Sequence, residues 1–140
     1  MSTTGTGMST AESFRAAVES KDLAAAGELL AADVVFHSPV TFHPFLGRET
    51  VSALLGEVAQ VFTDFRYTDE LEMDGGHALI FRAGVVGTDR EIEGIDLLRF
   101  DADGLIADFT VMLRPLSALV PFAQAMGERA QAAGLQTTRA

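Results

Sequence analysis

The feature that most constrains this 140-residue chain is a change in hydrophobic periodicity near residue 65. Residues 51–62 carry apolar side chains at helical spacing, which predicts one long helix. From there apolar and polar residues alternate, and three glycine-containing segments interrupt the alternation before it ends near residue 113. This pattern predicts strands joined by tight turns into a meander. One face of such an antiparallel sheet is buried, so we expect helices to pack against it.

Shorter elements precede the long helix. The segment Ser9-Thr10-Ala11-Glu12 has the pattern of a capping box, which predicts a helix to about residue 20. Asp22 predicts the start of a second short helix that continues to Leu30. The apolar run 34–38 predicts a strand before the long helix.

The segment from Pro115 onward has a helical composition, and Pro121 is expected to interrupt the helix. No repeat or linker divides the chain. We therefore expect a single domain over residues 10–134, with a disordered leader at 1–9 and a flexible tail at 135–140.

The composition argues against several classes of partner. No apolar run approaches the roughly 20 residues that span a bilayer, and the start of the chain lacks the zones of a signal peptide. These features favour a cytoplasmic protein with no membrane partner. The net charge of −10 argues against nucleic-acid binding, which requires clustered lysine and arginine. The single lysine and the abundant alanine favour a bacterial origin.

Neither a metal nor a cofactor is expected. The chain has no cysteine, which excludes thiolate catalysis and cysteine-based zinc sites. The three histidines, His37, His43 and His77, do not form a ligand-spaced pair, and His77 follows a glycine turn where we expect it to be exposed. Because the ordinary histidine pKa is about 6.5, His37 and His43 remain candidate bases whose role the pattern leaves open.

Asp96 is the residue that looks most suited to chemistry. It lies in the apolar strand pattern Ile95-Asp96-Leu97-Leu98 and shares a face with Ile92 and Leu98. Strands disfavour aspartate, and an acid on an apolar face is rarely buried without a partner or a task. A carboxyl group in apolar surroundings tends to keep its proton and then donates a hydrogen bond. A structural role, bonded to backbone or to an arginine, is the alternative.

Three segments of the chain carry a family pattern. They are Asp22-Leu23 followed by residues 29–33 and Ser38-Pro39-Val40, then Gly47-Arg48-Glu49-Thr50-Val51, and then residues 95–100 followed by Gly104. Together they resemble the ketosteroid-isomerase and SnoaL-like branch of the NTF2-like (cystatin-like) superfamily. The resemblance implies an α+β fold in which a curled antiparallel sheet forms a cone around the long helix, with two N-terminal helices and a C-terminal helical tail. It also implies a pocket in the cone and a homodimer through the sheet.

The family's catalytic roles transfer only in part. In the steroid isomerases a loop aspartate moves the proton, while a tyrosine and a protonated aspartate donate to the substrate oxygen. The resemblance places the protonated acid on Asp96, the tyrosine on Phe14 and the loop base on Ser38. Phe14 has no hydroxyl group and Ser38 is no base near neutral pH, so steroid isomerisation by that route is not expected.

Two functional hypotheses follow. In the first, a small apolar, ring-containing molecule binds in the pocket, and Asp96 is the catalytic acid–base group for isomerisation, cyclisation or dehydration. In the second, the domain only binds a ligand or dimerises, with Tyr67 and Leu71 on an exposed dimer face. The residues expected to contact the ligand are Phe14, Phe36, Ser38, Phe81, Phe109, Val111 and Leu113.

Overall fold

The computed structural model describes residues 9–137. The expected leader, apart from Ser9, and the last three residues of the expected tail lie outside this range. The helices are α1 (Thr10–Glu19), α2 (Leu23–Glu28), α3 (Arg48–Val61) and α4 (Leu116–Ala132). The strands are β1 (Leu30–His37), β2 (Phe45–Leu46), β3 (Phe62–Met73), β4 (Gly76–Val85), β5 (Glu91–Phe100) and β6 (Ile106–Arg114). Within residues 9–137, no helix is long and apolar enough to cross a membrane.

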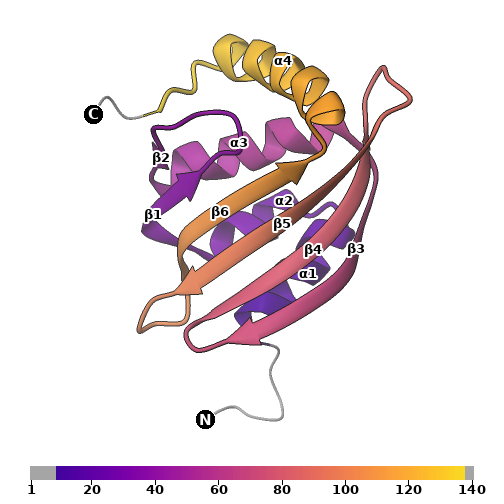
Figure 1. Cartoon of the computed structure of the whole chain (residues 1–140). Coiled ribbons are helices and arrows are strands. Elements are labelled where there is room, and N and C mark those ends of the chain that lie inside the picture. The colour runs from indigo at the N-terminus through magenta and orange to yellow at the C-terminus, as the bar shows by residue number, and fades with distance from the viewer. Residues whose placement is uncertain (1–8, 138–140) are drawn as a thin grey trace.

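The strands form one six-stranded sheet in the order β2-β1-β6-β5-β4-β3. The predicted meander is present as β3 to β6, whose neighbouring strands all pair antiparallel, whereas β1 pairs with β6 in parallel. The sheet curls without closing, and Figure 1 shows α1, α2 and α3 behind it, with α4 above its upper end beside α3. This arrangement confirms the α+β cone expected from the sequence.

Two elements near the N-terminus differ from expectation. The second helix ends at Glu28, and β1 starts at Leu30 instead of residue 34. The register between β1 and β6 shifts between Leu30 and Val35, so this part of β1 lacks the regular alternation that marks a strand. The strand β2 has only two residues, too few for any periodic signal.

The edge strand β3 contains the irregularity that matters most for the site. Tyr67 pairs with Phe81 and Asp69 pairs with Ile80, so one extra residue of β3 is inserted between these pairs. A bulge of this kind reverses which face the following side chains take. Tyr67, which precedes the bulge, points inward opposite Phe81 and is 7% exposed, whereas Leu71, which follows it, is 60% exposed on the outer face. The expectation that both residues lie on an outer face is wrong for Tyr67.

Helix α4 continues through Pro121 without a break, contrary to expectation. Proline removes one backbone donor, here the N–H that would reach the carbonyl of Ser117. The buried side chains of Ala118, Phe122 and Met126 hold the helix against the rest of the core. Packing therefore outweighs the local preference.

Candidate functional site

A cavity of about 440 Å³ lies inside the cone. Ligand sites in proteins typically have volumes of roughly 300–1,000 Å³, so this one suits a small organic molecule. Its walls come from the inner face of the sheet, from α1, the start of α2, α3 and α4, and from the loop after β1. Eight of the ten phenylalanines of the chain line it: Phe14, Phe36, Phe45, Phe62, Phe65, Phe81, Phe109 and Phe122.

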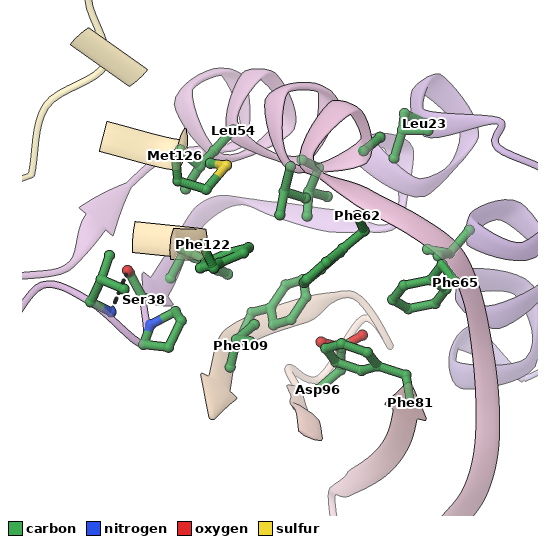
Figure 2. A pocket seen from close by; sticks show the side chains of 18 of the residues that line it. Leu23, Ser38, Leu54, Phe62, Phe65, Phe81, Asp96, Phe109, Phe122 and Met126 are labelled. Carbon is green, nitrogen blue, oxygen red and sulfur yellow. Dashed lines mark hydrogen bonds between the residues drawn. The ribbon is translucent and has the colours of Figure 1, made fainter. Parts of the chain in front are cut away.

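These phenylalanines form two groups, and the rings within each group are in contact. Figure 2 shows several of them around the open space. In the first group Phe109 meets Phe14 and Phe36 edge-on, with ring centroids 5.5 and 5.1 Å apart. In the second group Phe62 stacks on Phe122 at 5.1 Å. Aromatic contacts of this kind hold the rings in place, so the shape of the cavity is fixed by the packing of its own walls.

Asp96 is the buried acid of this cavity. It projects from β5 between Leu79 of β4 and Val111 of β6, and it is only 6% exposed. Burial raises the pKa of the Asp96 carboxyl from 3.8 to about 7, and a hydrogen bond from Tyr67 opposes that rise. Among the described residues, only one of its oxygens, Oδ2, has a hydrogen-bond partner. The other oxygen is therefore available to a molecule in the cavity.

The partner of Asp96 is Tyr67, the only tyrosine of the chain, whose hydroxyl donates to Oδ2 at 2.8 Å. Burial and the nearby Asp96 charge raise the pKa of Tyr67 well above its ordinary value, so the phenol keeps its proton and acts as a donor. The Arg15 guanidinium lies 5.7 Å from the centre of the Tyr67 ring. Glu19 and Glu70 hold Arg15 there through contacts of 3.2 and 2.8 Å. A partly exposed cation from α1 therefore lies over the ring of Tyr67.

The sequence analysis expected seven ligand-contacting residues besides Asp96. Six of them line the cavity: Phe14, Phe36, Ser38, Phe81, Phe109 and Val111. Leu113 does not; it lies against Gly94, where a β-carbon would also collide with the Phe81 ring. Ser38 uses its hydroxyl oxygen to accept the backbone N–H of Val40 at 3.1 Å. Ligand binding by these residues stays a prediction.

Other lining residues were not expected to face a ligand. Tyr67 is the most important of them, because the alternation of the sequence places it on one face with Leu71, and the bulge that separates their faces has no clear sequence signal. Phe122 and Met126 lay on a recognised apolar helix face, but periodicity alone does not say what such a face covers. Phe62 and Phe65 belong to the junction of α3 and β3, where the period changes.

The histidines do not reach the cavity. His37 lies on the outer face with Nε2 3.1 Å from Asp108 Oδ2, and His43 stacks edge-on against Phe42 with ring centroids 5.3 Å apart. The expectation that His77 is exposed is wrong, because its side chain is only 13% exposed. It follows the turn directly but points to the inner face, like Leu79. Among residues 9–137 no group of three or more potential ligands forms a metal site.

Comparisons with known proteins agree with this fold. The family model described as a SnoaL-like domain matches residues 11–109. A steroid delta-isomerase from Pseudomonas aeruginosa is 37% identical, with a TM-score of 0.82 over 91% of this chain and 93% of that one. An uncharacterized protein with a cystatin-like fold from Silicibacter pomeroyi is 33% identical, with a TM-score of 0.83 over 89% and 87% of the two chains. No curated protein matches the sequence significantly.

Proposed function

This chain belongs to the SnoaL-like domain family, and from that membership and the buried Asp96 we propose that it binds a small apolar, ring-containing molecule and transfers a proton on it. The observation that carries the proposal is one free carboxyl oxygen of Asp96 at the wall of an aromatic cavity. Isomerisation, cyclisation and dehydration are the reaction types that need such a group. The proposal involves no metal, cofactor, nucleic acid or membrane.

Asp96 is suited to act both as base and as acid. With a pKa of about 7, its ionised and protonated forms are both populated near neutral pH. The ionised oxygen takes a proton from a carbon next to a ligand carbonyl, and the resulting acid returns the proton at another atom. The Tyr67 hydroxyl stabilises the ionised form through Oδ2, which leaves the second oxygen free for this transfer.

The relative from Pseudomonas aeruginosa, a steroid delta-isomerase, makes a steroid ketone a reasonable first ligand to test. The chemistry would differ from the three-residue pattern of the isomerases, because Phe14 and Ser38 line the cavity without a phenol or a carboxylate. A single residue, Asp96, would then carry out both proton transfers. Tyr67 supplies the only phenol, and it comes from β3 instead of α1.

A non-catalytic binding protein is the second candidate function. It is favoured by the small number of titratable groups in the cavity wall. Apart from Asp96 and Tyr67, the titratable residues that line the cavity are Glu19, Lys21 and Asp64, all of which are exposed. A ligand anchored by Asp96 without reaction fits this arrangement equally well.

The experiment that separates the two candidates is hydrogen exchange on the ligand. The protein is mixed in D₂O with progesterone, with α-tetralone and with a β,γ-unsaturated steroid ketone, and exchange next to the carbonyl is followed by NMR. We expect exchange with the wild-type protein, its loss in Asp96→Asn, and its retention in the control Glu93→Gln on the outer face of β5. Binding without exchange would leave only the non-catalytic function, and absence of binding would overturn both.

The proposed partner of the chain is a second copy of itself, bound through the outer face of the sheet. Ile80, Ile95 and Met112 lie side by side across three strands, and Met112 is 52% exposed. An apolar stripe on a sheet face is a typical dimer contact. Sedimentation equilibrium is expected to give a dimer for the wild type and a monomer for Ile95→Glu; a monomeric wild type would refute this contact.

A further inference from the structure

Helix α1 ends with a lysine in a position that usually belongs to glycine. The N–H of Lys21 donates to the carbonyl of Val18 and the N–H of Asp22 donates to that of Ala17, at 3.0 and 2.8 Å. These two bonds define a common helix ending whose Lys21 position requires left-handed backbone, here with φ 61°. Helix α4 ends in the same way with Gly134 at φ 74°. A lysine in this conformation is strained relative to glycine, which has no β-carbon.

The strained residue lies at the rim of the cavity. Lys21 is the only lysine of the chain and is one of the residues that line the cavity. Leu23, the first residue of α2, also lines the cavity and lies on the same side of the open space as Phe65 in Figure 2. Backbone strain that persists at a binding cavity is commonly tied to function.

The charges around Lys21 leave it as the unpaired cation of this rim. Glu19 is bound by Arg15 at 3.2 Å, and Asp64 is bound by Arg66 at 3.3 Å. Both acids therefore already have a cationic partner. Among the described residues, Lys21 forms no ion pair or side-chain hydrogen bond.

From this placement we infer that Lys21 binds an acidic group of the ligand, which makes the ligand a ring-containing carboxylate. The ring system would occupy the aromatic cavity, and the carboxylate would stay at the rim in contact with the ammonium group. A compact ammonium on a flexible stem suits a point charge of this kind. This inference rests on the proposed function, since it assumes that a ring-containing molecule enters the cavity.

The test compares acids with neutral analogues that carry the same ring. Binding of pyrenebutyrate and pyrenebutanol, and of dehydrocholate and its carboxamide, is measured by fluorescence and calorimetry for the wild type, Lys21→Arg, Lys21→Gln and Lys21→Gly. We expect the wild type and Lys21→Arg to prefer each acid about three- to fivefold, as for an exposed ion pair. The preference is expected to vanish in Lys21→Gln and Lys21→Gly, and to shrink in high salt.

The glycine variant separates function from folding. Because Lys21→Gly relieves the left-handed strain, it is expected to raise the Tm by about 2 °C while it loses the preference for acids. Equal binding of acid and neutral analogue by the wild type would overturn the role of Lys21 alone. A failure of all four compounds to bind would overturn the proposed function together with this inference.

Discussion

Strand β5 carries carboxyl groups on both faces, and the two environments shift their proton affinity in opposite directions. On the inner face, burial raises the pKa of Asp96 to about 7. On the outer face, hydrogen bonds from Arg66 and Arg82, at 2.8 and 3.2 Å, lower the pKa of Glu91. The inner acid has a neutral phenol as its partner, whereas the outer acid has two cations. The same strand thus holds one group suited to proton transfer and one suited to surface ion pairing.

The largest effect on the free energy of unfolding is expected from Asp96→Asn, because this substitution removes the ionisable group from the inner face of β5. The folded pKa of Asp96 is raised above its ordinary value of 3.8, so its contribution to stability is fully present below pH 3.8 and is lost as the pH rises to about 7. That loss is on the order of 4 kcal/mol. Asparagine keeps an oxygen for Tyr67 but cannot ionise. Urea denaturation between pH 4 and pH 8 should therefore show a variant that is more stable than the wild type at high pH.

The comparison of the two proteins at low pH is the control for this prediction. Near pH 4 the two proteins should unfold at similar urea concentrations, because the wild-type carboxyl is then neutral in the folded state. Parallel pH profiles for wild type and variant would show that Asp96 is not held in a proton-binding environment.

A smaller effect is expected from Tyr67→Phe, which removes the hydrogen bond but keeps the ring beneath Arg15. The Tyr67 hydroxyl lowers the pKa of Asp96, so its removal should raise that pKa further. The free energy of unfolding should fall by about 1–2 kcal/mol, because a buried carboxyl oxygen loses its donor. Carbon-detected NMR titration of the aspartate carboxyls measures the pH at the midpoint of the Asp96 titration directly.

The neighbouring residue offers a control for the tyrosine variant. Thr68 is exposed, and its hydroxyl makes only a long bond of 3.4 Å to the Ile80 carbonyl. Thr68→Val should leave the Asp96 midpoint in place. An unchanged midpoint in Tyr67→Phe would mean that the phenol does not bind the acid in solution.

The smallest effect is expected from Glu91→Gln on the outer face. The folded pKa of Glu91 is lowered, so its contribution to stability is present above its ordinary value of 4.5 and is lost as the pH falls. The pair is exposed, and salt screens it. Thermal denaturation of the variant should show a slightly lower Tm than the wild type near pH 7, and this difference should disappear in high salt. A large loss would contradict the contrast between the two faces.

Most of the architecture was predictable because it follows from regular periodicity. The spacing of residues 51–62 predicted α3, and the alternation after residue 65 predicted the four strands β3 to β6, which the structure confirms. The bulges were not predictable, since one inserted residue leaves the local composition unchanged. For the same reason Tyr67 was placed on the same face as Leu71, which lies beyond the bulge.

The candidate site was predictable at its centre and not at its edges. Asp96 drew attention because an acid interrupts an apolar strand face, and the structure places it at the cavity wall. Its partner Tyr67 lies 29 positions away, and the pairing of β3 with β4 and of β4 with β5 brings them together. The rim residue Lys21 gave no signal either, because a left-handed lysine looks like any other lysine in a sequence.

The close packing of Phe81 against Gly94 has a consequence for how this cavity can diversify. Gly94 does not line the open space, yet a β-carbon there would meet the rings and methyl groups of Phe81 and Leu113. Phe81 lines the cavity, so any larger residue at position 94 would push its ring toward the open space. The usable volume of the cavity therefore depends on a residue that does not line it. In related sequences, the identity of that one residue should separate domains that accept bulky ring systems from those restricted to smaller ones.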